Sequence, residues 1–204
     1  MREAGIITRG RVMKPITVSA NLTLTPLELR DAEELFKLTD ANRDYLREWL
    51  PWLDRIKHID DTRAWIRAAQ LQAVHNNGTQ MAIRMHSCIV GIVGHRQIDW
   101  RNRLTSLGYW LARDFQGLGV VTMACNRLVT HAFSDTRLNR VEIRCAVENH
   151  KSRAIPQRLG FQQDGVVRDA EWLYDHFVDH IVYRMLAREW PVGTIESFVA
   201  DSGE

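Results

Sequence analysis

A glycine-containing segment in the middle of the chain has residue types that could bind an anion. Gly117 and Gly119 lie one residue apart, directly before an apolar-periodic run, and no carboxylate occurs between Phe115 and Ser134. Glycines allow the backbone to turn with positive φ and let another molecule approach closely. The first turn of a helix carries free N–H groups and the positive end of the helix dipole. The segment therefore predicts a strand, loop and helix unit that binds a phosphate group.

Two common phosphate-binding motifs fit this segment poorly. A P-loop needs Gly-Lys-Ser/Thr at its end, whereas this chain continues from Gly119 to Val120, Val121 and Thr122. A dinucleotide fingerprint needs a third glycine where the chain has Thr122, although Glu142 lies at a suitable distance for a ribose contact. The glycines could also serve packing alone, in a tight connection between a strand and a helix. The missing acids and the preceding strand favour a ligand.

The composition of the chain limits the classes of protein it resembles. The 204 residues are enough for one domain with a sizeable core. The 27 basic and 25 acidic side chains leave a net charge of +2, which gives no argument for a nucleic-acid or membrane surface. The sequence has no apolar run of about 18 residues and no signal-peptide core, so we expect a cytoplasmic protein.

Two other sets of reactive side chains have simpler interpretations. The three cysteines, Cys88, Cys125 and Cys145, show no short C-x-x-C spacing and lie in apolar stretches, which predicts small buried side chains. His176 and His180 are four residues apart in a strand context, without an obvious third ligand. We therefore expect no metal site.

Helices and strands alternate along the chain and place the glycine segment between a strand and a helix. Asp31 opens an amphipathic helix that we expect Pro51 to end, and Asp60 or Asp61 caps a second helix that stops at residues 76–78. The predicted strands cover residues 22–29, 79–85, 88–98, 105–112, 140–147, 161–168 and 180–186, with a loop at 168–176, and the predicted helices cover 31–50, 62–75, 120–133 and 149–160.

The alternation of elements also predicts the domain organisation. Helices interleaved with a mixed sheet indicate an α/β or α+β fold in two or three layers. Residues 1–15 are basic and without clear periodicity, so we expect a flexible leader before a single domain at 16–190. Residues 191–204 form a tail that is either a free end or a partner contact.

Three motifs in this order carry a family resemblance. The stretch "GYWLARDFQGLGVVTMA" resembles the Q/R-x-x-G-x-G/A signature of GCN5-related N-acetyltransferases, with Gln116, Gly117, Gly119 and Val121 in its places. Val121 departs from the usual small last residue. The stretch "VENHKSRAIPQRLGF" resembles the second half of that site, and "HFVDHIVYRML" resembles the closing strand of the family. Together they resemble the RimJ/RimL-like branch over about residues 20 to 190.

The resemblance implies a GNAT fold with acetyl-CoA as the cosubstrate and no metal. The expected sheet is mixed, mostly antiparallel and splayed, with about seven strands flanked by helices. The strand containing Tyr109 parts from the strand of residues 141–147, and the pantetheine arm fits the gap between them. The pyrophosphate then meets the N–H groups of residues 118–122. The implied cofactor-binding residues are Trp110, Leu111, Gln116, Gly117, Leu118, Gly119, Val120, Val121, Thr122 and Asn149.

The resemblance also implies two catalytic residues. Ser152, three residues after Asn149, occupies the place of a hydroxyl that protonates the departing thiolate, although a serine there could instead bond the helix backbone. Glu171 is the candidate base, although an isolated loop glutamate is as often simply solvated. Trp172 beside it could exclude water and raise its pKa. A backbone N–H near Leu111 is expected to face the oxyanion.

A helix proline and two tryptophans complete the predicted site. Pro156 cannot donate to the Ser152 carbonyl and its ring presses on that carbonyl, so we expect a bent turn there. Trp49 and Trp52 flank Pro51 where the family's acceptor enters, and at least one is expected to line the substrate site, although Trp49 could be core.

The acceptor class stays open at this point. The RimJ/RimL-like resemblance implies a protein N-terminus, as in a ribosomal protein. A small amine, such as an antibiotic or a polyamine, is an alternative acceptor, and a non-catalytic CoA-binding protein is an alternative of another class. Nucleic-acid and membrane partners are not expected, and a homo-oligomer is left open.

Overall fold

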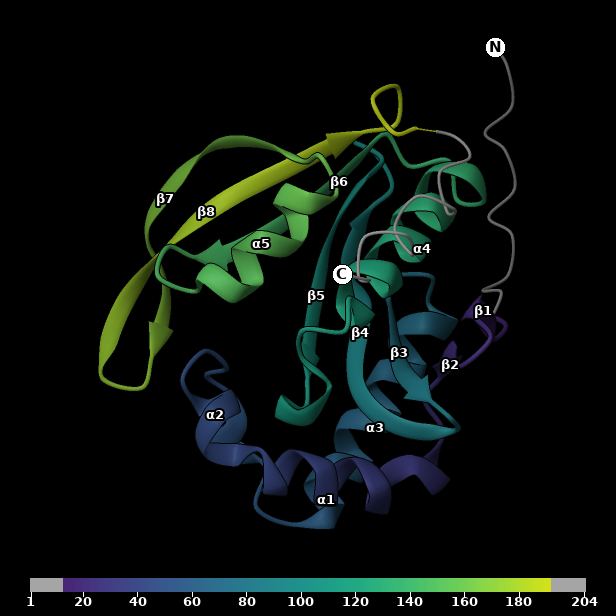
Figure 1. The fold of residues 1–204 in the computed structure, drawn as a ribbon, viewed down its shortest axis with the longest axis vertical. Coiled ribbons are helices and arrows are strands. Elements are labelled where there is room, and N and C mark those ends of the chain that lie inside the picture. The colour runs from purple at the N-terminus through teal and green to yellow at the C-terminus, as the bar shows by residue number, and fades with distance from the viewer. Residues whose placement is uncertain (1–12, 192–204) are drawn as a thin grey trace, which may run out of the picture.

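A computed structural model describes residues 13–191, which form one mixed sheet with helices on both faces (Figure 1). The eight strands are ordered β1-β2-β3-β4-β5-β6-β8-β7. All neighbours pair antiparallel except β5 and β6, which are parallel. The strands are β1 (Ile16–Ser19), β2 (Leu22–Pro26), β3 (Thr79–Met85), β4 (Cys88–Asp99), β5 (Leu104–Leu111), β6 (Arg140–Ala146), β7 (Gln162–Leu173) and β8 (His176–Leu186).

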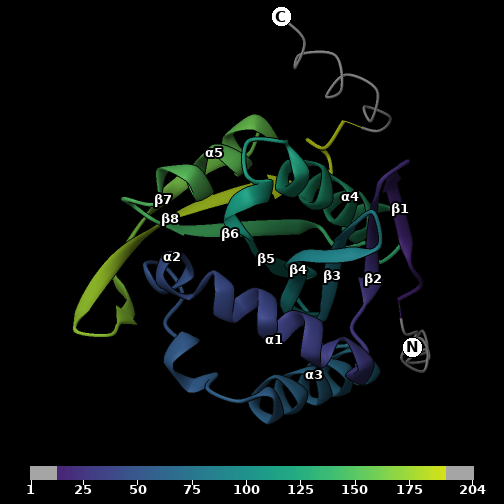
Figure 2. The same cartoon turned by 60° about the horizontal axis from the view of Figure 1, so that its bottom comes forward.

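The helices cover the two faces of the sheet as separate layers. Figure 2 shows α1 and α3 on one side of the sheet and α4 and α5 on the other. The helices are α1 (Ala32–Ala41), α2 (Arg43–Arg47), α3 (Ile59–Val74), α4 (Val120–Ser134) and α5 (His150–Arg158), with short 3-10 turns at Leu29–Asp31, Leu53–Arg55 and Arg113–Phe115. In residues 13–191, no helix combines the length and apolar character needed to cross a membrane.

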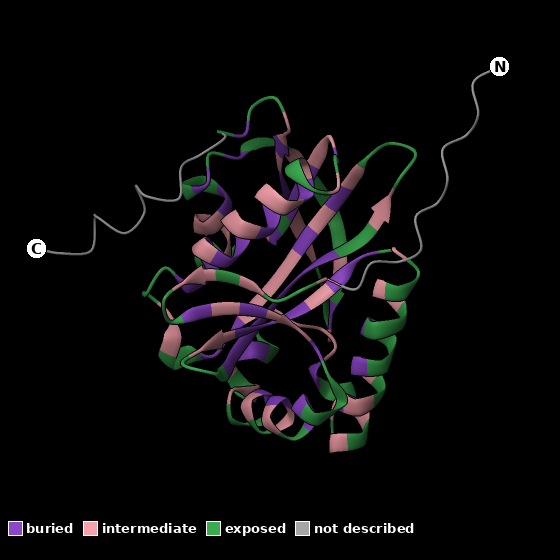
Figure 3. Cartoon of the chain, turned by 90° about the vertical axis from the view of Figure 1, so that its right-hand side faces the viewer, coloured by how far each residue is buried: buried purple, intermediate pink, exposed green. Residues whose placement is uncertain are grey.

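Helix α4 is anchored in the larger of two hydrophobic clusters. Its predicted apolar stripe is confirmed as buried, with Val121, Ala124, Cys125, Leu128 and Ala132 each at most 8% exposed. These side chains pack on strands from β2 to β8, so the buried colour follows the sheet and the inner helix faces (Figure 3). A smaller cluster joins α1 and α3 to the opposite face. The start of α4 is thereby held rigidly at the end of β5.

The expected sheet of about seven strands has an eighth strand, β1, at its edge. The predicted loop at 168–176 was wrong, because β7 continues to Leu173 and forms a hairpin with β8 around Tyr174 and Asp175. Most β7 side chains are exposed, so the polar sequence of an edge strand resembled a loop. A register shift between Val167 and Glu171 interrupts the pairing and conceals it further.

The predicted helix at 31–50 is broken in the structure. Helix α1 ends at Ala41, and the Asn42 side chain donates to the Leu38 carbonyl at 2.9 Å, which competes with continued helix. Helix α2 ends at Arg47, before Pro51 is reached. The second helix, α3, begins at Ile59 with His58 as its N-cap, so the prediction that Asp60 or Asp61 caps it was wrong. Both aspartates lie in the first turn, where the Asp61 carboxylate accepts the N–H groups of Lys57 and His58 just before the helix.

The cysteine prediction was correct for two of three residues. Cys125 and Cys145 are buried, whereas Cys88 is exposed. Cys88 begins β4 directly after the turn at His86 and Ser87, so the hairpin end leaves it in solvent. The apolar residues that follow Cys88 in β4, rather than Cys88 itself, enter the core.

A buried histidine pair between β4 and α4 predicts sensitivity to acid. His95 is 3% exposed and its ring lies 6.3 Å from that of His131. Burial, assisted by the nearby His131, lowers the pKa of His95 from 6.5 to about 4. The unfolded chain therefore binds a proton below pH 6.5 that the folded chain excludes until about pH 4, so stability is lost as pH falls through that window.

We expect a His95→Phe variant to be less sensitive to acid than the parent protein. The shift of the His95 pKa corresponds to about 3 kcal/mol of unfolding free energy between pH 7 and pH 4. Thermal or urea unfolding at several pH values measures the slope for both proteins. The same acid-dependent loss in both proteins would show that other groups cause it.

Candidate active site

A cleft opens in the sheet where β5 and β6 part. The two strands pair only from Leu104 to Leu107 on β5 and from Arg140 to Ile143 on β6. Beyond these residues the described chain shows no pairing between them, which confirms the predicted splay. The edge of β5 from Gly108 onward therefore has main-chain groups available to a ligand.

The oxyanion prediction depends on which way the main chain of β5 points. The Ala112 N–H donates to the Val90 carbonyl on the β4 side. Since N–H groups alternate along a strand, the Leu111 N–H points to the side from which β6 has departed. This orientation suits an oxyanion donor, and the role itself stays a prediction.

The glycine segment forms an open cradle at the end of β5. Gly117 and Gly119 have φ values of +78° and +70°, and a Cβ built on either would meet no atom within 4 Å. Within residues 13–191, the structure gives no hydrogen-bond acceptor to the N–H groups of residues 117–122. No acidic side chain lies in the first turn of α4. The cradle therefore fits a pyrophosphate, which would accept these N–H groups at the positive end of the helix.

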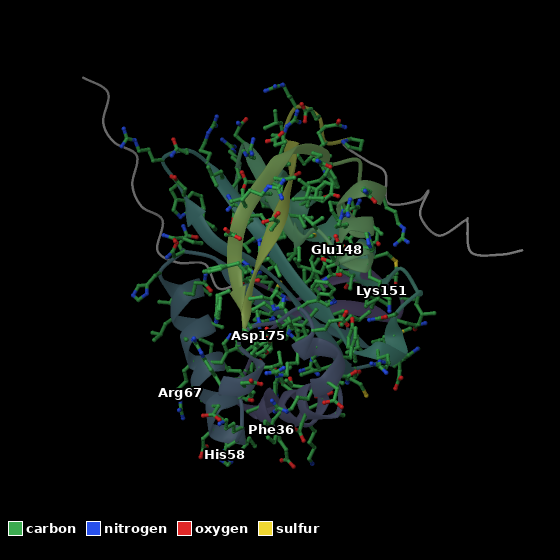
Figure 4. All side chains as sticks on the ribbon, turned by 90° about the vertical axis from the view of Figure 1, so that its left-hand side faces the viewer. Phe36, His58, Arg67, Glu148, Lys151 and Asp175 are labelled. Atoms are coloured by element: carbon green, nitrogen blue, oxygen red, sulfur yellow. The ribbon has the colours of Figure 1, made fainter. Side chains whose placement is uncertain are left out.

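Gln116, the first residue of the signature, is held by side chains from two other elements. Its amide nitrogen donates to the Tyr45 hydroxyl of α2, and its amide oxygen accepts from Lys151 Nζ at 3.2 Å. The Lys151 side chain belongs to α5, and Figure 4 labels it together with Glu148, which precedes that helix. The loop before the cradle is thus joined to both α2 and α5.

Ser152 lies in the first turn of α5, on the β6 side of the cleft. The Asn149 side chain accepts the Ser152 N–H at 3.0 Å, so Asn149 caps the helix. The Ser152 hydroxyl lies 3.3 Å from Cys145 Sγ and donates to the Tyr109 hydroxyl at 3.3 Å. Burial raises the pKa of the Cys145 thiol, which keeps it protonated. Three polar side chains therefore meet at one place beside the cleft.

Sequence reasoning did not identify Tyr109 or Cys145 as members of this cluster. Pro156 lies inside α5 as expected, and the Ser152 carbonyl accepts the Tyr109 hydroxyl at 2.9 Å. A signal was present, because a proline beyond the first turn of a helix leaves one carbonyl without its usual donor. The partner, however, comes from a strand 43 residues away.

Glu171 lies on β7 and contacts a histidine of β8. Its carboxylate is 3.5 Å from His180 Nε2, and its side chain is 30% exposed. The expectation that Trp172 shields Glu171 was wrong, because neighbouring strand residues point to opposite faces. Trp172 is 51% exposed and packs edge-to-face against Phe177, with ring centroids 4.8 Å apart. The partner of Glu171 is therefore His180, not Trp172.

The two tryptophans of the predicted acceptor site have different surroundings in the structure. Trp52 lines a small pocket with Trp110, Trp65 and residues of α1 and α3. The Trp110 side chain also packs on the smaller hydrophobic cluster, so it lies on the α1 and α3 face of the sheet. Trp49 is half-buried and follows α2. Trp52, Trp65 and Trp110 thus line one pocket on that face.

The β7–β8 hairpin is attached to the segment that carries these tryptophans. The Tyr174 hydroxyl donates to the Leu50 carbonyl at 2.6 Å, and the Arg47 guanidinium lies 3.7 Å from the centre of the Tyr174 ring. Figure 4 shows Asp175 at the tip of this hairpin. The hairpin that carries Glu171 and the segment after α2 therefore border the same side of the molecule.

Two alternative sites fit the structure poorly. Glu142 is 7% exposed and binds Arg140 and Arg144, so it is not free for a ribose. His176 pairs with Asp175 and His180 with Glu171. Across residues 13–191, no group of three or more metal-ligating side chains occurs.

Comparisons with known proteins match this geometry. Residues 21–162 match the family described as "Acetyltransferase (GNAT) domain". The chain is 36% identical over 174 residues to a Bacillus subtilis (strain 168) protein named "Putative ribosomal N-acetyltransferase YdaF", covering 85% of this chain and 95% of that protein.

Two solved structures are also similar. The microcin C7 self-immunity acetyltransferase MccE, in complex with acetyl-CoA and AMP, is 31% identical with a TM-score of 0.81, covering 85% of this chain and 96% of that one. The ribosomal L7/L12 alpha-N-protein acetyltransferase RimL, in complex with coenzyme A, is 26% identical with a TM-score of 0.82, covering 84% and 97%. The family match and these relatives cover most of the chain, and the splayed cleft and the glycine cradle agree with them. The chain therefore belongs to the GNAT acetyltransferase family and is an acetyl-CoA-dependent N-acetyltransferase.

Proposed function

We propose that this enzyme acetylates the N-terminal α-amine of a protein, with Glu171 as the base and Ser152 as the acid. The observation that carries the proposal is the placement of Glu171, 30% exposed and paired with His180, on a hairpin that extends past the helices (Figure 1). A chain end on a large acceptor can approach such a surface. The relatives named as ribosomal acetyltransferases support an acceptor of this kind.

The residues of the chain account for each proton in the transfer. Acetyl-CoA supplies an acetyl thioester, and the amine nitrogen forms the new bond to its carbonyl carbon. Glu171 accepts the proton that the amine loses, directly or through a water molecule. The Ser152 hydroxyl gives its proton to the sulfur as the carbon–sulfur bond breaks, and Ser152 then regains a proton from solvent. The Leu111 N–H faces the oxygen on which charge develops.

The chemistry of amines favours an α-amine over lysine. An α-amino group has a pKa near 8, so roughly a tenth is neutral at pH 7, whereas lysine, with a pKa near 10.4, is neutral to only a few parts in ten thousand. A partly exposed carboxylate can therefore deprotonate an α-amine more easily than it can deprotonate a lysine side chain. The proposed base therefore matches the less basic acceptor.

Acetylation of a panel of amines tests the acceptor class. We expect intact-mass spectrometry to detect one added acetyl group on peptides with free N-termini. The same peptides with blocked N-termini and a free lysine should react much more slowly. Faster reaction of the lysine peptides would overturn the proposal.

A small amine is the second candidate acceptor, favoured by the likeness to MccE, whose structure holds acetyl-CoA and AMP. Small amines, including one linked to AMP, therefore belong in the same panel. Preferential acetylation of these compounds would favour this second candidate.

A Ser152→Ala variant is expected to lose turnover rather than cofactor affinity. A proton donor to the thiolate acts mainly in the transition state, so kcat should fall about tenfold or more while the Kd for CoA is unchanged. Steady-state kinetics and a CoA titration measure the two quantities. Ser134→Ala, at the exposed end of α4, is the control and should be unaffected. Equal losses of kcat and affinity would assign Ser152 to binding or capping.

A further inference from the structure

We infer that Tyr109 is a positioning residue that holds Ser152 in place through both its carbonyl and its hydroxyl. This inference rests on the role proposed above for Ser152. Tyr109 comes from β5 and Ser152 from α5, so their contact joins the two sides of the cleft where the sheet is open. No other tyrosine in the described residues contacts Ser152.

The first part of the argument is the carbonyl of Ser152. In a continuous helix this carbonyl would accept the N–H of the residue four positions later. That residue is Pro156, which has no N–H. The Tyr109 hydroxyl donates to the carbonyl instead, at 2.9 Å. Tyr109 thus supplies the donor that Pro156 removes.

The second part is the hydroxyl of Ser152. It donates to the same phenol oxygen at 3.3 Å, with Cys145 Sγ on another side, also at 3.3 Å. One oxygen atom of Tyr109 therefore contacts both the main chain and the side chain of Ser152. This double contact restrains the turn and the side-chain rotamer together, which a catalytic hydroxyl requires.

The protonation state of Tyr109 suits this role. Burial raises the pKa of Tyr109 well above 10, so the phenol remains protonated and keeps its hydrogen for the Ser152 carbonyl. Its oxygen is then left with lone pairs that can accept from Ser152. When the serine proton turns to the sulfur, only this second contact has to break.

A double-mutant cycle distinguishes positioning from core packing. Tyr109→Phe keeps the ring, so packing alone predicts no change in kcat. We expect kcat to fall about tenfold with KM for acetyl-CoA unchanged, and to change less than about twofold when the same substitution is made in Ser152→Ala. Tyr183→Phe is the matched control, because its buried hydroxyl also contacts α5 but through Arg153 and Gln157.

A second variant tests the carbonyl directly. Pro156→Ala restores an N–H that can serve the Ser152 carbonyl. In the Tyr109→Phe protein we expect it to raise both the thermal midpoint and kcat, with part of the kcat loss remaining because the hydroxyl contact is still absent. Failure of Pro156→Ala to raise the midpoint would overturn the carbonyl contact.

The outcomes separate this inference from the proposed function. A slow Ser152→Ala protein, together with an equal Tyr109→Phe loss in both backgrounds, would overturn the positioning role alone. A Ser152→Ala protein with normal kcat would overturn the acid role of Ser152 and, with it, this inference. If Tyr109→Phe prevents folding, the thermal midpoint of the Tyr109→Phe, Pro156→Ala protein distinguishes positioning from core packing. A folded double variant supports the carbonyl contact, and a double variant that still does not fold overturns it.

Discussion

Replacing Glu171 with glutamine is expected to lower kcat/KM about a hundredfold at neutral pH. Glutamine keeps the size and hydrogen-bonding capacity of the side chain, so the β7–β8 pairing around it should persist. It cannot accept a proton from the amine. The loss should therefore appear in turnover, while the thermal midpoint and CoA affinity stay close to those of the parent.

The pH dependence of this loss identifies its cause. As pH rises, more of the acceptor arrives already neutral, so the variant should recover relative to the parent protein. Recovery should begin near pH 8 for an α-amine and only toward pH 10 for a lysine, following their separate pKa values. A pH series of kcat/KM for both proteins, with one acceptor of each kind, makes the measurement.

A matched control tests whether loss of a carboxylate–histidine contact is by itself enough to lower kcat/KM. Asp135 contacts His131 at 3.9 Å near the end of α4, away from the cleft, as Glu171 contacts His180. Asp135→Asn should leave kcat/KM unchanged. Near-normal turnover in Glu171→Gln would remove Glu171 from the reaction. A deficit that does not change with pH would instead assign Glu171 to positioning the charged amine.

A Gly119→Val substitution is expected to remove the protection that CoA gives against heat. Ligand binding to the folded state raises the thermal midpoint, and that increase depends on affinity. The valine side chain would occupy the space where an anion approaches the N–H groups of the first turn of α4. Losing two hydrogen bonds to a charged group, at about 1.5–3 kcal/mol each, weakens CoA binding at least about a hundredfold.

The control for Gly119→Val is Gly160→Val. Gly160 has a similar φ of +75°, and a Cβ there would meet only Met185 at 4.0 Å, so both variants have the same backbone strain. Gly160 follows α5 and lies outside the cradle. Only Gly119→Val should lose CoA affinity, although both should melt at lower temperature.

Pantetheine provides a second comparison, because it lacks the pyrophosphate. Binding of pantetheine to Gly119→Val should be close to that of the parent protein. Calorimetry or thermal-shift titration with both ligands measures the difference. Unchanged CoA affinity in a folded Gly119→Val protein would rule out the cradle.

Local sequence patterns were sufficient for the elements that bind the cosubstrate. The apolar periodicity of residues 120–133 predicted α4 and its buried stripe, and Gly117 and Gly119 predicted the positive φ values at its start. The motif resemblance added the splay between β5 and β6, which the pairing confirms. The helix and the two glycine turns depend on residues close together in the chain, so a short window contains them, whereas the splay joins two distant strands and came only from the resemblance.

Other features were wrong or missing because they depend on burial and on distant partners. The exposed edge strand β7 resembled a loop, since few of its side chains enter the core. Cys88 resembled a core residue because the apolar residues after it are buried and it is not. Asn42 broke a helix whose apolar periodicity continued through it.

The sequence by itself therefore determined the family, the cradle and the loss of the usual helical donor to the Ser152 carbonyl at Pro156. Only the tertiary structure decided which group donates to that carbonyl in place of the missing N–H, and which residue contacts Glu171. Tyr109 and Ser152 are 43 residues apart, and Glu171 meets His180 only because β7 extends into a hairpin with β8. A side-chain hydrogen bond requires atoms within about 3.5 Å, and no periodicity along the chain encodes a distance between two separate elements. That distance is set by how the sheet and helices pack together.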